Sequence, residues 1–205
     1  KTVNEITITY GPYQMNSVKK TARLYRCTNI QIIVASKSIS CFMSDGTGAG
    51  HAMVLTVHGQ VSNVLLDQIS YGAPVVTLFQ GPGASNANTD GHQLVLLDGT
   101  NFGKAGLAIS KIDQVLYGKN SDPFDKWYDA TSTCTITISH IRIACETIPG
   151  FGKELRWVLK IDGQMSTTST TNYAPPTVTG IFQADGVTAI TDASANGDVT
   201  IVLLG

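Results

Sequence analysis

Four cysteines are the residues whose spacing most clearly predicts a chemical bond in this chain. They fall into two pairs, Cys27 with Cys41 and Cys134 with Cys145, and each pair brackets two adjacent predicted strands. Adjacent strands bring such residues within disulfide reach, so we expect two disulfides and an oxidising compartment. Four buried free thiols are the alternative. The spacing is not CxxC and no histidine pair accompanies it, which argues against a metal site.

The other residue types that could do chemistry do not converge. His51, His58, His92 and His140 fall on different predicted elements without ligand spacing. There is no Gly-x-Ser-x-Gly elbow and no plausible Ser/His/Asp set. The glycine-rich Gly46–Gly50 resembles a phosphate loop, but it precedes a strand and lacks the helix N-terminus that would bind phosphate. We therefore expect no catalytic residue, no metal and no cofactor, and we do not expect an enzyme.

One long loop, NSDPFDKWYD at residues 120–129, gathers three acidic and two aromatic residues: Asp122, Asp125, Asp129, Trp127 and Tyr128. A calcium site would need many converging oxygen ligands. The two aromatic residues are candidates for contact with a glycan. A plain surface insertion, or a contact with a neighbouring copy of the chain, is the interpretation that the loop favours.

The run STTSTT at residues 166–171 is a second candidate for modification. In a secreted protein its threonines could carry O-linked sugar, and the candidates are Thr167, Thr168, Thr170 and Thr171. An ordinary threonine-rich strand before the joint is the alternative, and it is the interpretation that we favour.

These residues lie within an internal repeat of about 105 residues. The two cysteine pairs correspond, as do Gly59-Gln60 with Gly163-Gln164 and Phe79-Gln80 with Phe182-Gln183. Three further matches are Tyr10 with Tyr117, Tyr71 with Tyr173, and Gly99 with Gly205. Differences in spacing fall between predicted strands, as expected where loops absorb changes in length.

Alternating apolar residues and glycine-rich turns predict short β-strands throughout. In Leu155–Ile161, alternation places Trp157 on the same face as Leu155 and Leu159, which predicts core packing. The remaining strands are expected at Glu5–Tyr10, Thr28–Val34, Lys37–Cys41, Ala52–His58, Val61–Tyr71, Val75–Phe79, Gln93–Asp98, Lys111–Tyr117, Thr133–Ser139, Ile141–Cys145 and Met165–Tyr173. Seven short strands in each repeat are typical of an immunoglobulin-like sandwich.

The phase of the repeat divides the chain into unequal parts. Residues 73–173 form a complete unit, residues 1–72 correspond to the last five strands of a unit, and residues 174–205 correspond to the first two. The predicted joints between repeats contain aromatic and proline residues: Tyr71, Pro74, Tyr173, Pro175 and Pro176. The last part therefore carries the strands that the first part lacks.

Several motifs resemble the IPT/TIG family of immunoglobulin-like domains. They are Pro74-Val75-Val76 opening a strand, LVLLDGTNFG at Leu94–Gly103, and Pro149-Gly150-Phe151-Gly152 after Cys145, with Tyr173 as the closing aromatic residue. The resemblance implies an all-β chain of tandem immunoglobulin-like sandwiches, one complete and two partial. Such domains serve as spacers in surface receptors and adhesins, as dimerising or DNA-contacting modules, and as accessory domains of polysaccharide enzymes.

Composition narrows these functions. Fourteen basic and fifteen acidic residues leave a net charge of −1, so no footprint for nucleic acid is present. No apolar run approaches the ~20 residues of a membrane helix. We expect an extracellular or cell-surface structural protein, a repeat unit of a filament, stalk or adhesin. Its partners would be neighbouring copies, joined head to tail by chain continuation or by strand complementation. A carbohydrate-binding or cell-adhesion module is the alternative.

Overall fold

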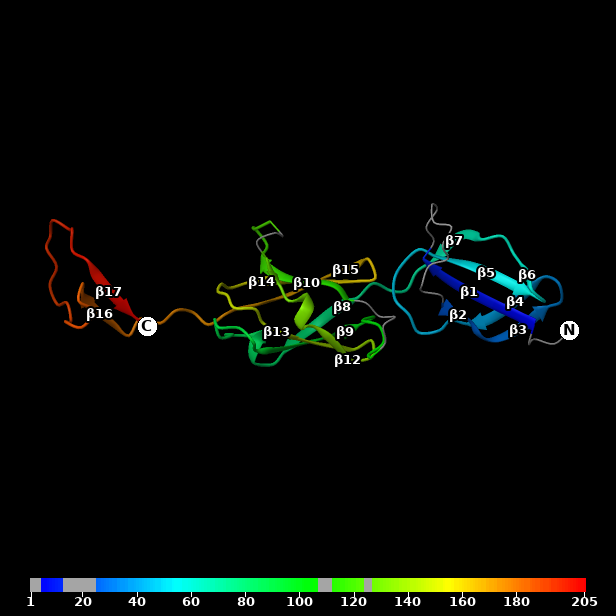
Figure 1. The fold of residues 1–205 in the computed structure, drawn as a ribbon, viewed down its shortest axis with the longest axis horizontal. Helices are drawn as coiled ribbons and strands as arrows, with labels where there is room; N and C mark the ends of the chain where they lie inside the picture. The colour runs from blue at the N-terminus through cyan, green and yellow to red at the C-terminus, as the bar shows by residue number, and fades with distance from the viewer. Residues whose placement is uncertain (1–4, 13–24, 107–111, 124–126) are drawn as a thin grey trace. The chain divides into compact units, whose positions relative to one another are not determined.

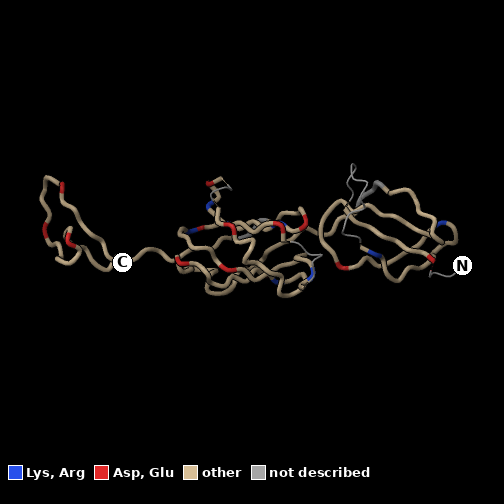
Figure 2. Tube along the Cα trace, viewed as in Figure 1, with Lys and Arg blue, Asp and Glu red and all other residues tan. Residues whose placement is uncertain are grey.

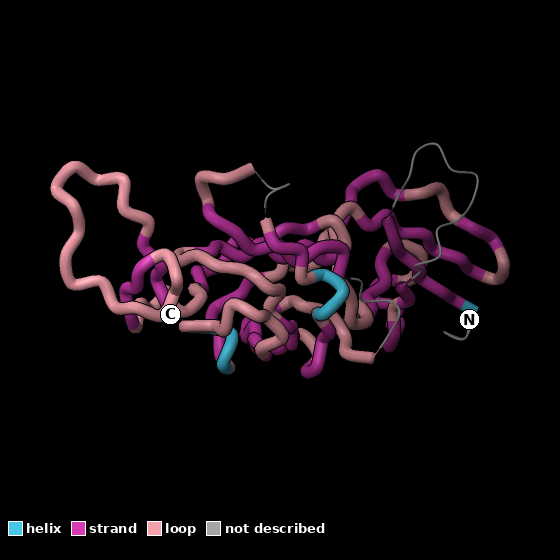
Figure 3. Tube along the Cα trace, turned by 60° about the vertical axis from the view of Figure 1, so that its left-hand side comes forward, coloured by secondary structure: helices cyan, strands magenta, loops and turns pink. Residues whose placement is uncertain are grey.

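The computed structural model describes residues 5–12, 25–106, 112–123 and 127–205, without the side chains of residues 66–68 and 167–169. The described chain is all-β, built from antiparallel sheets and short 3-10 turns (Figures 1 and 3). It divides into two compact units, Lys1–Tyr173 and Ala174–Gly205. We call residues 5–72 the head, residues 73–173 the central sandwich and residues 174–205 the tail.

The central sandwich contains two four-stranded sheets. One has the order β12-β13-β9-β8, with bounds Thr135–Ile138, Arg142–Glu146, Leu94–Thr100 and Val75–Gln80. The other has the order β11-β10-β14-β15, with bounds Tyr128–Asp129, Ile112–Lys119, Leu155–Ile161 and Gln164–Thr171. The β8–β9 connection contains the 3-10 turn η2 (Pro82–Ala84), and η4 (Thr131–Thr133) precedes β12.

Both sheets contribute to a closed core between them. Val95 and Leu97 of β9 have no exposed surface, and neither have Trp157 and Leu159 of β14. The predicted disulfide between Cys134 and Cys145 links the residue before β12 to β13. The alternation seen in the sequence of β14 thus places Trp157 inside the core, as predicted.

The head repeats one of these sheets and half of the other. A sheet of order β2-β1-β5-β6, in which β7 also pairs with β5, corresponds to the sheet that contains β10. Its strands are β2 (Tyr25–Arg26), β1 (Ile6–Pro12), β5 (His51–Val57), β6 (Gln60–Val61) and β7 (Leu65–Ile69). A separate hairpin of β3 (Thr28–Val34) and β4 (Ser38–Phe42) corresponds to β12 and β13. The predicted Cys27–Cys41 disulfide is formed here. Within residues 5–12 and 25–72, no strand corresponds to β8 or β9.

The tail is a hairpin of β16 (Gly180–Gln183) and β17 (Ile201–Leu204). None of its residues is buried within the chain. A two-stranded hairpin on its own is at best marginally stable in water, because it has no second layer to cover its apolar face.

The tail hairpin repeats the details of the β8–β9 pair. The Thr77 hydroxyl donates to the carbonyl of Asp98, and the Thr179 hydroxyl donates to the carbonyl of Leu204. A Cβ on Gly99 would collide with the carbonyl oxygen of Val75, and one on Gly205 would collide with that of Thr177. The match of Gly99 with Gly205 made from the sequence therefore has a structural basis, because both positions require the absence of a side chain.

One sequence match needs correction. Phe79 lies opposite Leu97, but Ile181, not Phe182, lies opposite Leu203. Gly180 lies opposite Leu204 as Leu78 lies opposite Asp98, so the spacing of the two copies is unbroken here and Phe182 corresponds to Gln80, which points to the other face. Ile181 is therefore the counterpart of Phe79.

The core of the central sandwich is more completely buried than that of the head, so shortening a core side chain should cost more stability in the central sandwich. Leu159→Ala should lower the free energy of unfolding of the central sandwich by about 2–5 kcal/mol. The counterpart Leu55→Ala should cost less in dilute solution, because Leu55 is only half-buried. Hydrogen exchange with mass spectrometry reports each sandwich separately. Equal losses at low protein concentration would contradict the lower burial of Leu55 in the head.

Candidate functional site

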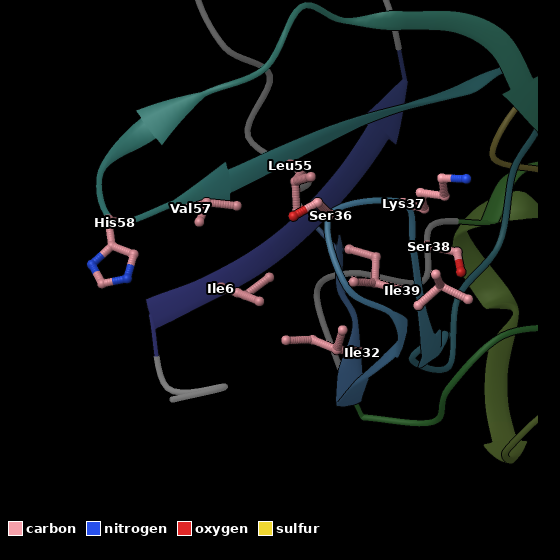
Figure 4. Close-up of a pocket in the computed structure, with 10 residues that line it drawn as sticks. Ile6, Ile32, Ser36, Lys37, Ser38, Ile39, Leu55, Val57 and His58 are labelled. Carbon is pink, nitrogen blue, oxygen red and sulfur yellow. The ribbon is translucent and has the colours of Figure 1, made fainter. Parts of the chain in front are cut away.

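The head contains an open apolar groove, which we call the head groove (Figure 4). Its walls are side chains of β1, β3, β4 and β5 and of the turns beside them: Ile6, Ile32, Val34, Ser36, Lys37, Ser38, Ile39, Leu55, Val57 and His58. Its volume is about 320 Å³. The groove is open to water, so the aliphatic side chains on its walls are only partly covered.

The central sandwich shows what fills the equivalent space. Leu159 and Ile161 are buried there, whereas their counterparts Leu55 and Val57 in the head are only half-buried. Ile32, which lies opposite Ile39 in the β3–β4 hairpin, is 42% exposed. In the central sandwich, β8 and β9 complete the sheet that lies over these positions. The head groove therefore corresponds to the part of the core that β8 and β9 cover in the central sandwich.

The tail presents a matching apolar face. Its four members Val178, Ile181, Ile201 and Leu203 are 60%, 48%, 49% and 55% exposed, respectively. Their counterparts in the central sandwich are Val76, Phe79, Val95 and Leu97, of which three are buried and Phe79 packs against the core. We call Val178, Ile181, Ile201 and Leu203 the tail face. Side chains of the kind that form the core of the central sandwich are therefore exposed in the tail.

A cluster of tyrosines closes the joint end of each sandwich. The hydroxyls of Tyr10 and Tyr71 lie 2.8 Å apart, and those of Tyr117 and Tyr173 lie 2.6 Å apart. The hydroxyls of Tyr71 and Tyr173 donate to the backbone carbonyls of Ser44 and Ile148, respectively. Burial raises the pKa of both Tyr71 and Tyr173. Both hydroxyls therefore stay protonated and act as hydrogen-bond donors. The two predicted joint tyrosines thus fix the C-terminal ends of their sandwiches.

A third tyrosine in each cluster was not found from the sequence. Tyr25 pairs with Tyr10 across β1 and β2, as Tyr128 pairs with Tyr117 across β10 and β11. The two were missed because Tyr25 precedes its cysteine by two residues, whereas Tyr128 precedes Cys134 by six. Only the strand register makes them equivalent.

At the joint between head and central sandwich, a glutamine side chain of the central sandwich binds two backbone groups of the head. The Gln164 side-chain oxygen accepts from the N–H of Gly48 at 3.1 Å, and its amide nitrogen donates to the carbonyl of Tyr71 at 3.0 Å. Beside it, the Thr47 hydroxyl donates to the carboxylate of Asp162. Among the predicted joint prolines, Pro74 is buried, whereas Pro175 and Pro176 are exposed.

His51 lies buried among the head tyrosines. Its ring is 1% exposed and packs edge-on against Tyr10, Tyr25 and Tyr71. Its Nε2 lies 3.1 Å from the Thr47 carbonyl and donates to it, which leaves Nδ1 without a hydrogen-bond partner. Desolvation lowers the pKa of His51, against the opposing effect of the backbone carbonyl groups. The residue is structural, as its place on an apolar strand implies.

The aromatic pair proposed for glycan contact does not form an exposed platform. Trp127 is 9% exposed and its Nε1 donates to the carbonyl of Asp122 at 3.0 Å. Tyr128 is half-buried in β11 and stacks toward Tyr117. The interpretation of this stretch as a plain surface insertion therefore fails at its C-terminal end, because β11 joins the sheet. Asp125 lies outside the described residues, and the Asp129 carboxylate accepts from the N–H of Thr131.

The threonine run is a strand, β15, and one of its candidates is closed to modification. Thr171 is 4% exposed, and its hydroxyl accepts from Nε1 of Trp157 at 2.9 Å. Thr170 is exposed, while the side chains of Thr167 and Thr168 lie outside the described residues. Burial thus rules out O-linked sugar at Thr171.

Charged residues are scattered over both units without a basic patch in the described chain (Figure 2). The same residues hold no group of three or more His, Cys, Asp or Glu side chains that could bind a metal ion. None of the described helices is long and apolar enough to cross a membrane. The two disulfides place the protein in an oxidising, non-cytosolic compartment.

Comparison with protein-family models and with curated proteins finds no match to this chain. The resemblance to IPT/TIG domains therefore stays a prediction from the motifs.

The buried histidine predicts that acid destabilises the head. Because the folded-state pKa lies below the ordinary value of 6.5, the unfolded chain binds a proton that the folded head does not. The free energy of unfolding should therefore fall as pH drops below about 6.5, and the loss should level off below the folded pKa. His51→Leu, which copies Leu155 of the central sandwich, should remove this component from pH-dependent denaturation curves.

The exposed His92 supplies the control, because its side chain is 76% exposed. His92→Leu should leave the pH dependence of head unfolding unchanged. An unaltered acid response in the His51 variant would contradict the structural role assigned to that ring.

Proposed function

We propose that this protein is an extracellular structural protein, a repeat unit of a filament, stalk or adhesin that continues head to tail. The observation that carries this proposal is complementarity. The head lacks the counterparts of β8 and β9, and the tail is a counterpart of those strands with its core-type side chains exposed. Neighbouring copies are its partners, and the proposed role requires neither catalysis nor a cofactor.

The geometry of such a contact supports an open assembly. The surface on the head differs from the surface on the tail, so their contact is heterologous and leaves one free surface of each kind at the ends. A heterologous contact that does not close into a ring propagates into a fibre. Covalent continuation of the repeat would produce the same succession of sandwiches, so both routes lead to a rod of similar units.

The physical driving force is the removal of apolar surface from water. Fully burying an aliphatic side chain contributes about 1.5–3 kcal/mol, and the tail face and the head groove each hold several such side chains. The uncovered edges of β4 and β17 also carry backbone groups that can extend a ladder. Two disulfides suit a protein exposed outside the cell, because such bonds form and persist in an oxidising environment.

The proposal predicts assembly that depends on concentration. Sedimentation velocity of the full chain over a wide concentration range should show species growing beyond a dimer, and electron microscopy should show rods with a repeating sandwich. A chain that stays monomeric throughout this range would contradict self-assembly. Closed rings of fixed size would contradict an open filament.

A further inference from the structure

We propose that β17 of a second copy pairs antiparallel with β4 of the head, with Ile201 and Leu203 entering the head groove. This inference rests on the proposed function and adds the partner segment, its direction and its register. The occupant of the groove is thus residues 174–205 of another molecule of the same chain.

The register follows from the complete sandwich. There β9 pairs with β13, with Leu97 opposite Ile143 and Val95 opposite Cys145. Ile39 and Cys41 are the repeat counterparts of Ile143 and Cys145. Since Gly205 and Leu204 occupy the positions of Gly99 and Asp98, Leu203 would lie opposite Ile39 and Ile201 opposite Cys41.

The two strand edges needed for this pairing are free in the described chain. β4 pairs with β3 alone, and β17 pairs with β16 alone. In the central sandwich the corresponding strands β13 and β9 each have two neighbours. The second copy therefore extends the hydrogen-bonded sheet at β4 and covers the head groove at the same time. This is recognition by strand addition, in which pockets receive alternate side chains.

The two faces of β17 differ in a way that fixes which side chains enter. Leu203 is the counterpart of Leu97, which is fully buried, whereas Leu204 is the counterpart of Asp98, whose carboxylate binds Arg142 at the surface of the central sandwich. A carboxylate at the position of Leu204 would therefore lie on the outer face of the sheet, although Ser38 stands in the head where Arg142 pairs with Asp98. At the position of Leu203 it would be buried without a partner, which is strongly unfavourable.

The same correspondence places a second contact across the boundary. Gly152 corresponds to Gly48, because each accepts at its carbonyl from the N–H of the joint tyrosine, Tyr173 or Tyr71. Gln60 of the head corresponds to Gln164 and is exposed. In the assembly, Gln60 of the acceptor copy would accept from Gly152 and donate to the carbonyl of Tyr173 in the donor copy.

A matched pair of variants of the full chain tests the register. Leu203→Asp should weaken assembly by at least about 100-fold in sedimentation equilibrium, whereas Leu204→Asp should stay within about threefold of the wild type. The two residues are neighbours of the same type in an exposed hairpin, so neither change touches the cores of residues 1–173.

The outcomes separate the two proposals. Assembly lost in Leu204→Asp and kept in Leu203→Asp would overturn the register, and equal effects of both changes would overturn the groove contact. Wild-type protein that does not assemble would overturn this inference together with the self-assembling form of the proposed function, and only covalent continuation of the repeat would remain. Wild-type assembly unaffected by either variant would leave self-assembly standing and remove the tail from it.

Mixing tests whether the strand comes from another molecule. Ile32→Asp places a charge in the groove at a side chain that is already 42% exposed, so this variant should fold but accept no tail. Alone, neither Ile32→Asp nor Leu203→Asp should assemble. An equimolar mixture should form a heterodimer and stop there, because one intact head meets one intact tail. A mixture that stays monomeric, or that grows further, would refute head-to-tail exchange.

Gln60→Ala tests the second contact against Gln31→Ala, another exposed glutamine of the head. We expect the Gln60 variant to weaken assembly by about five- to tenfold, as for loss of paired hydrogen bonds, and the Gln31 variant to behave as the wild type. Identical affinities would remove Gln60 from the boundary.

Discussion

The pairing of β9 with β13 is the interaction on which the organisation of this chain depends. It places Val95 and Leu97 between two sheets, where Trp157 and Leu159 cover them and none of the four retains exposed surface. Where that strand is present the core is closed. Where it is missing, in the head, the same kinds of side chain line an open groove. Burial of apolar surface thus distinguishes the central sandwich, whose core is covered, from the head and the tail, whose apolar side chains remain partly exposed.

The tyrosine pair that closes each sandwich repeats along the chain, and at the joint between head and central sandwich a glutamine of the second binds the turn and the carbonyl beside that pair. This joint combines a neutral glutamine that binds backbone groups with a hydroxyl that binds the carboxylate of Asp162.

Much of this could be predicted from the sequence. The alternation in LRWVLKI identified a core strand, and the spacing of the cysteines identified both disulfides. Other features could not be predicted, because they depend on register and on neighbours distant in the chain. Nothing local shows that Trp127 is covered, that Thr171 binds the indole of Trp157, or that Ile181 and not Phe182 takes the place of Phe79.

The sequence by itself determined the repeat, its phase and the kind of strand that each part carries, because internal similarity and two-residue periodicity are properties of the chain alone. Only the tertiary structure decided which side chains are left bare. Exposure depends on whether a second layer lies over a strand, and that layer comes from residues far away in sequence. The groove beside β4 and the uncovered face of β17 are therefore visible only in three dimensions.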